Sequence, residues 1–105
     1  MASNFKISVR QDGDGLNLVM QGDFDGTSAC ELLDVLKNKC NGIDRVFIDT
    51  SGLNEIHPFG QDTFQNNLYV LKSQPIRFIF TGKNATQIAP ERSKFCHIMP
   101  YHRSS

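Results

Sequence analysis

Residues 45–60 read RVFIDTSGLNEIHPFG, and this stretch decides the fold. The apolar run 46–48 predicts a short strand buried on both faces, which places it in the centre of a sheet. Residues 50–55 are expected to form a loop. Pro58 then suits the first turn of a second helix, because the amide that proline lacks would have no helical partner there.

The segment that precedes this stretch predicts a hairpin and a helix. Apolar and polar residues alternate over 5–9 and again over 16–20, and the turn QDGDG at 11–15 separates the two runs. This pattern is typical of two antiparallel strands with one face buried. Residues 22–27 are expected to end the second strand, and Ser28 with Glu31 forms a capping-box pattern that starts the first helix.

Apolar residues then recur at helical spacing between positions 29 and 40. Cys30 and Cys40 fall on this apolar side, where a free cysteine usually packs as a small hydrophobe. Charged residues are left for solvent on the opposite side. They are Glu31, Asp34, Lys37 and Lys39. The first helix is therefore predicted to be amphipathic.

Apolar residues at helical spacing within 58–71 predict the second helix. Residues 76–80 predict a fourth strand, and a short third helix is expected within 85–98. Strands separated by helices should run parallel through right-handed crossovers. The elements predict an α/β fold, a mixed sheet backed by helices. Residues 1–105 are expected to form a single domain in which 100–105 are a frayed tail.

Composition narrows the function classes. Lys plus Arg and Asp plus Glu both number 11, so the overall charge does not favour nucleic acid or an anionic membrane as a partner. The three cysteines form no CxxC pair, and no apolar run approaches the length of a membrane helix. A cytoplasmic protein without membrane insertion, metal or cofactor is expected.

Two stretches together resemble the STAS domain family, which includes bacterial anti-sigma factor antagonists and cytosolic domains of sulfate transporters. LNLVMQGDFDGTSACELLDVL at 16–36 is similar to the family's second strand, turn and first helix, and RVFIDTSGL at 45–53 is similar to its central strand. The resemblance implies a four-stranded mixed β-sheet with helices packed mainly on one face.

The resemblance also implies a switch surface at the start of the second helix, here His57, Pro58, Phe59 and Gly60. Family members regulated by an anti-sigma kinase typically carry Asp-Ser-Ser-Gly there, and the second serine takes the phosphate. Phe59 occupies this phosphoacceptor position and has no hydroxyl, so it is non-phosphorylatable. His57 and Phe59 are interpreted either as exposed interface anchors or as a helix cap and a core residue.

The resulting hypothesis is a non-catalytic interaction module in bacterial signalling or transcription regulation. Its protein partner would be a kinase-like anti-sigma factor or a transporter subunit, and a homodimer is left open. The predicted partner-binding residues surround the start of the second helix. They are Asp25, Thr27, Asn54, His57, Phe59, Gly60, Gln61 and Thr63. The alternative is an accessory subunit of a lipid or anion transport system, or a ligand-binding STAS domain.

Two other groups of residues are not expected to form a metal site or a catalytic site. Cys96, His97 and His102 could suggest a metal site or a nucleophile with a base, but sequence neighbours seldom have the required geometry. The aspartates at 12, 14, 23 and 25 lack the spacing of a calcium loop, and solvated turns explain them better. The sequence therefore predicts no catalytic residue.

Overall fold

The structure, a computed structural model, describes residues 4–13, 15–39, 42–68, 76–89 and 96–98. Eight elements follow one another along the chain. They are β1 (Lys6–Asp12), β2 (Gly15–Phe24), α1 (Gly26–Lys39), β3 (Arg45–Ile56), α2 (Pro58–Leu68), β4 (Arg77–Thr81), α3 (Ala85–Ile88) and β5 (Cys96–Ile98). The strands form one sheet in the order β1-β2-β3-β4-β5.

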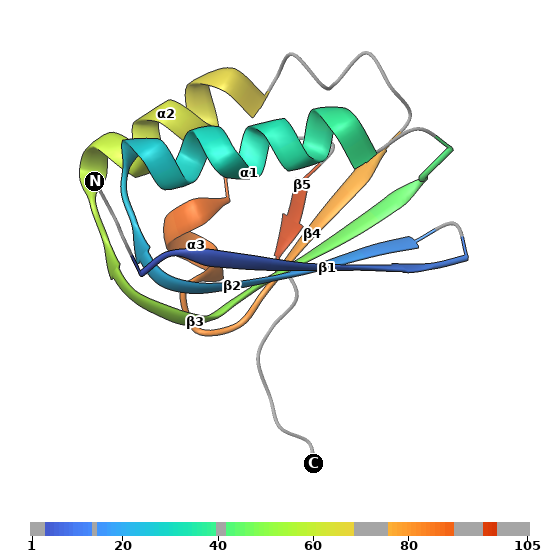
Figure 1. The fold of residues 1–105 in the computed structure, drawn as a ribbon, viewed down its shortest axis with the longest axis horizontal. Coiled ribbons are helices and arrows are strands. Elements are labelled where there is room, and N and C mark those ends of the chain that lie inside the picture. Colours follow the sequence, from blue (N-terminus) through green and yellow to red (C-terminus); the bar gives the residue numbers. More distant parts are fainter. Residues whose placement is uncertain (1–3, 14, 40–41, 69–75, 90–95, 99–105) are drawn as a thin grey trace.

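The sheet has the predicted mixed topology. β1 pairs with β2 antiparallel, whereas β2, β3, β4 and β5 run parallel to one another. Helices α1 and α2 lie next to each other over one face of the sheet (Figure 1). The α/β class, the hairpin, the central place of β3 and the short third helix are confirmed. β5 is an added strand in a segment where the sequence predicted helix.

The core lies between the sheet and helices α1 and α2. Buried side chains from the centre of the sheet meet the apolar stripes of the two helices. Three rings join these layers: Phe24, Phe64 and Phe80 are each fully buried and meet edge to face, with ring centroids 6.0 to 6.3 Å apart. This arrangement is the favoured one for aromatic pairs, and it fixes α2 to the two strands.

β2 and β3 are both longer than predicted. The parallel pairing continues as far as Phe24 opposite Ile56, with register shifts between Val19 and Gln21 and between Gly22 and Phe24. Such irregularities let a ladder continue through polar and glycine residues. The predicted strand end at 22–27 and the predicted loop at 50–55 are therefore wrong, because pairing between neighbouring strands overrides the local turn signal.

The start of α1 also differs from the prediction. The helix begins at Gly26, and Asp25 caps it by accepting a hydrogen bond from the Ser28 amide at 2.9 Å. Ser28 is buried in the first turn instead of capping the helix. Cys30 is exposed, so its assignment to the core is wrong, and Cys40 lies outside the described residues. The four charged residues assigned to solvent are indeed exposed.

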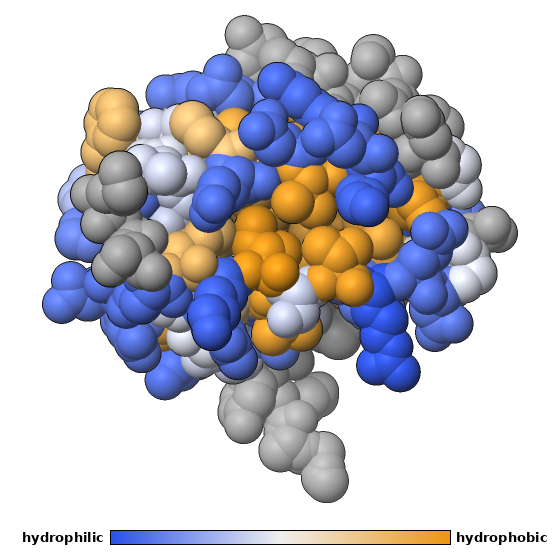
Figure 2. Space-filling model, in the orientation of Figure 1, coloured by the Kyte–Doolittle hydropathy of each residue, from blue (hydrophilic) through white to orange (hydrophobic). Residues whose placement is uncertain are grey.

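The β1 edge of the sheet is only partly covered. Phe5 and Ile7 pack against the core together with Val35 of α1, but Val9 is exposed, contrary to the predicted alternation. As an edge strand, β1 has a described neighbour on one side only. Figure 2 shows the resulting apolar area between α1 and β1, with hydrophilic residues above and below it.

Thr50 connects β3 to the turn that follows β4. It is fully buried, and its hydroxyl donates to the Thr81 carbonyl at 2.8 Å while accepting from the Asn84 amide at 3.2 Å. The Asn84 side chain in turn donates to the Thr50 carbonyl at 3.0 Å. The hydroxyl of Thr50 is thus a structural group and is not accessible for phosphorylation in the folded chain.

We predict that Thr50→Val lowers the free energy of unfolding by about 1 to 3 kcal/mol, because it leaves part-buried backbone groups of Thr81 and Asn84 without their partner. Urea denaturation measures the effect. Thr86→Val, at an exposed position of α3, is the matched control and should be nearly neutral. Equal effects of the two substitutions would contradict the structural role of Thr50.

Candidate functional site

The carboxyl ends of β2 and β3 meet at one edge of the sheet, because the two strands are parallel neighbours. The His57 amide donates to the Phe24 carbonyl at 2.9 Å, which ties the two strand ends together. α1 starts at Gly26 and α2 at Pro58, immediately beyond this junction. Two helix starts therefore lie next to each other at the carboxyl ends of β2 and β3.

Gly60 sets how closely the two helix starts approach. It is buried, and a Cβ atom at this position would lie 2.8 Å from the carbonyl carbon and oxygen of Asp25 and from the Phe24 carbonyl oxygen. These are backbone atoms, so they cannot move aside as a flexible side chain would. The sequence predicted that Gly60 permits the close approach of a partner. The side of Gly60 that lacks a Cβ atom instead faces the backbone of Phe24 and Asp25.

A surface hollow of about 720 Å³ opens over the two helix starts. Its lining comes from the end of β2, from α1 and from the first turns of α2. The residues are Asp23, Asp25, Gly26, Thr27, Cys30, His57, Phe59 and Thr63. Among the described residues, this lining contains two carboxylates and no lysine or arginine, so this part of the surface is acidic. We call it the acidic hollow.

The Phe59 ring stands at the rim of the acidic hollow. It is 73% exposed, which makes it the most exposed large hydrophobic side chain in the described part of the chain. One edge of the ring lies over Gly26, where an added Cβ atom would come within 2.7 Å of it. Phe59 is therefore an exposed residue, and the interpretation that it belongs to the core is wrong.

Five of the eight predicted partner-binding residues line the acidic hollow: Asp25, Thr27, His57, Phe59 and Thr63. The other three do not. Gly60 is buried beneath it, and Asn54 is exposed on β3 outside the lining. The Gln61 side chain donates to the Gln87 carbonyl at 2.9 Å, so it points toward α3.

Sequence reasoning missed Asp23, Gly26 and Cys30 as lining residues. Asp23 was assigned to a solvated turn, but it lies in β2, and its position next to the β3 end follows from parallel pairing. Cys30 reaches the hollow because it follows Gly26 by four residues and Thr27 by three, which places it on the same face of α1. The side chains of Cys96 and His97 lie outside the described residues, as does His102.

Asp25 holds the start of α1 electrostatically. Its carboxylate accepts hydrogen bonds from the Ser28 amide at 2.9 Å and from the Ser28 hydroxyl at 3.1 Å. The bond from the Ser28 amide is the largest cause that holds the pKa of Asp25 below its ordinary value of 3.8, while burial opposes this shift. The carboxylate is thus charged at neutral pH, and it gives the hollow a permanent negative group.

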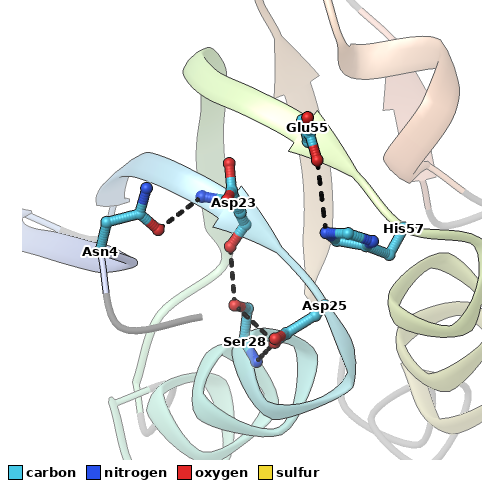
Figure 3. Close-up of polar contacts among 6 residues, drawn as sticks. All are labelled: Asn4, Asp23, Asp25, Ser28, Glu55 and His57. Atoms are coloured by element: carbon cyan, nitrogen blue, oxygen red, sulfur yellow. Dashed lines mark hydrogen bonds and ion pairs between the residues drawn. The ribbon is translucent and has the colours of Figure 1, made fainter. Parts of the chain in front are cut away.

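Asp23, Glu55 and His57 form a second polar group beside the hollow (Figure 3). The His57 Nε2 atom lies 3.8 Å from Glu55 Oε1, and one ligand atom from each of the three residues lies within 4.8 Å of the other two. Asn4 and Ser28 fix the backbone of Asp23 from its two sides, through bonds of 3.2 and 2.9 Å. The three side chains thus converge from two neighbouring strand ends.

No protein-family model and no curated protein matches this sequence. Several solved structures do. The anti-sigma factor antagonist SpoIIAA, in its unphosphorylated form, matches with a TM-score of 0.63 and 11% identity over 93% of this chain and 89% of SpoIIAA. An uncharacterized DUF3478 family protein with a SpoIIAA-like fold from Shewanella loihica PV-4 matches with a TM-score of 0.52 and 18% identity over 83% of this chain and 75% of that protein.

A third similar structure is that of Mglu, with a TM-score of 0.63 and 24% identity over 81% of this chain. The match spans only 20% of Mglu. At these identities the likeness concerns the fold alone, and it establishes that this chain has a STAS-like, SpoIIAA-type fold. Among the described helices, none has both the length and the apolar composition needed to cross a bilayer.

We predict that Gly60→Ala destabilises the chain, although alanine favours a helix by about 1 kcal/mol over glycine. The added Cβ atom would meet backbone at 2.8 Å and push the helix starts apart. The midpoint of urea denaturation measures the effect. Gly15→Ala is the matched control, because its nearest atom would be 3.4 Å away. A Gly60→Ala chain as stable as the wild type would contradict the close packing described here.

A second prediction concerns the pH dependence that Asp25 contributes. Because its folded-state pKa lies below the ordinary value, its stabilisation is present above that value and is lost as pH falls through the folded-state pKa. Asparagine caps a helix about as well but has no charge to lose. On acidification from about pH 6 to about pH 2, the wild type should therefore lose stability relative to Asp25→Asn.

Acid titrations followed by circular dichroism at several urea concentrations give this difference directly. The other carboxylates are common to both chains, so their contributions cancel in the comparison. A difference between the two chains that stays constant over the whole range would show that the Asp25 carboxylate is not stabilised by the helix start.

Proposed function

We propose that this chain is a non-catalytic interaction module that binds a protein partner through Phe59 and the acidic hollow. The observation that carries the proposal is the Phe59 ring, 73% exposed at the first turn of α2. Aromatic rings that stand free at a surface and are flanked by polar groups are typical anchors of protein interfaces. Threonines at positions 27 and 63 and the Asp25 carboxylate supply that polar surround.

The chemistry of the hollow indicates what the partner presents. Asp23 and Asp25 are both in the lining, and among its described residues His57 alone can carry a positive charge. A complementary partner would bring lysine or arginine to the carboxylates and an apolar side chain or pocket to Phe59. We therefore propose a partner surface that is basic and apolar together.

The fold supports a role in bacterial signalling or transcription regulation, because SpoIIAA, with a similar fold, is an anti-sigma factor antagonist. The position that carries a phosphorylated serine in the resembled family is Phe59 here, so the proposed contact is not switched by phosphorylation at that position. We therefore propose that docking is permanent, because the Phe59 ring cannot acquire the charge of a phosphate group.

The contacts around Cys30 support a non-catalytic role. Cys30 is the one described cysteine whose side chain can be placed, and it is exposed in the hollow. Among the hydrogen bonds of the described residues, none joins its thiol to His57 or to a carboxylate. A cysteine nucleophile needs such a base within hydrogen-bond reach.

We predict that Phe59→Asp weakens partner binding at least tenfold and leaves the fold intact, because an exposed anchor contributes to the complex and little to the core. The measurement is affinity capture from a native lysate with the wild-type chain, followed by titration of the recovered partner against both chains. Circular dichroism checks the fold.

Val9→Asp is the control, since it makes the same kind of change at an exposed position of β1, away from the hollow. It should bind the partner as the wild type does. The wild-type affinity should also fall with rising salt, as expected for an acidic surface that meets a basic one. Equal affinity of Phe59→Asp and wild type would remove this surface as the docking site.

A further inference from the structure

The ends of β2 and β3 bring three metal-ligating side chains together. Phe24 of β2 is paired with Ile56 of β3, and both pack on the core side. Since successive residues of a strand face opposite sides, Asp23 and Glu55, which precede them, are directed away from the core. The register shifts just before this pair, and His57 lies beyond the end of β3, so its place beside Glu55 comes from the turn into α2. The backbone thus brings the three positions to one edge of the sheet, and the side chains converge in their present rotamers.

The main chain that carries two of these residues is held on both sides. Asp23 receives a bond from Ser28 and gives one to Asn4. The His57 amide donates to the Phe24 carbonyl at 2.9 Å, and its carbonyl accepts from the Gln61 amide at 3.0 Å. The backbone positions of Asp23 and His57 are therefore fixed, and only side-chain rotation is needed when an ion binds.

The charges of the cluster are poorly balanced. Asp23 and Glu55 bring two carboxylates within 4.8 Å of each other, and His57 is the only basic side chain that forms an ion pair with either of them among the described residues. Two negative groups at this distance repel each other. A cation that binds between them would remove the repulsion and would be bound more tightly because of it.

We infer that Asp23, Glu55 and His57 form a binding site for a divalent cation of the zinc class. One imidazole nitrogen and two carboxylate oxygens are a donor set that Zn²⁺ accepts at about 2.0 to 2.2 Å, whereas Mg²⁺ and Ca²⁺ prefer oxygen alone. Ligand atoms around a tetrahedral ion lie roughly 3.4 Å apart at such bond lengths, so the side chains must close by about an ångström.

The exposure of the ligands allows this closure. The side chain of Glu55 is 72% exposed and that of His57 is 47% exposed, so both can rotate toward Asp23 without disturbing the core. The same exposure leaves the remaining coordination position open to water. Two of its three ligands, Asp23 and His57, also line the acidic hollow, but the inference rests on the geometry of the ligand atoms and not on partner docking.

Isothermal titration of the metal-free chain with zinc chloride tests the site. The wild type should bind one Zn²⁺ per chain with a dissociation constant below about 100 µM, and Asp23→Asn and His57→Ala should each weaken binding at least tenfold. Zinc should also raise the melting temperature of the wild type and not that of His57→Ala. Titration with Mg²⁺ or Ca²⁺ should give no comparable binding.

Two controls keep the result specific. Asp34→Asn removes an exposed carboxylate of α1 outside the cluster, and His97→Ala removes a histidine next to Cys96; both should bind zinc as the wild type does. Absence of zinc binding to the wild type would overturn the inference. Binding that persists in both Asp23→Asn and His57→Ala would overturn it as well, and neither result would affect the proposed docking through Phe59.

Discussion

The close contact between two helix starts, made possible by Gly60, is the constraint on which the functional surface depends. Parallel pairing brings the ends of β2 and β3 to one edge, and the bond from His57 to Phe24 holds them together. The missing side chain of Gly60 then lets the first turn of α2 rest on the backbone at Asp25. The Phe59 ring, on the residue before Gly60, lies over Gly26 and faces solvent.

The same junction determines the charge of the surface. Asp25 caps α1, and its lowered pKa keeps it ionised at neutral pH, so its carboxylate serves the fold and the acidic hollow at once. Asp23 and His57 belong to the strand ends, so their backbone positions are also set by the sheet. An apolar anchor beside fixed negative charge is a combination that selects a basic partner, and the candidate cation site lies on the edge of this surface.

Much of the fold could be predicted from the sequence, because the spacing of apolar residues indicates which side of a helix or strand is buried. The hairpin, the amphipathic helices and the strand at 46–48 were confirmed, although this strand is fully buried on one face only and Phe47 on the other face is half-buried. The errors occur where pairing between strands overrides local signals, as in the extensions of β2 and β3 through glycines. The start of the second helix was identified from Pro58. Asp23 was not identified as part of this site, since only the pairing of β2 with β3 brings it beside His57. Gly60 was assigned to a partner contact, because its packing against Asp25 produces no pattern in the local sequence.

The most direct test of the docking surface is to map the complex at residue level. The isotope-labelled chain would be titrated with the captured partner while its backbone amides are followed by nuclear magnetic resonance. The account predicts that the largest shifts fall in two separate segments, residues 25–30 and 57–63, which are adjacent only in the folded chain. Shifts confined to β1 or to the apolar area between α1 and β1, with both of these segments unchanged, would contradict it.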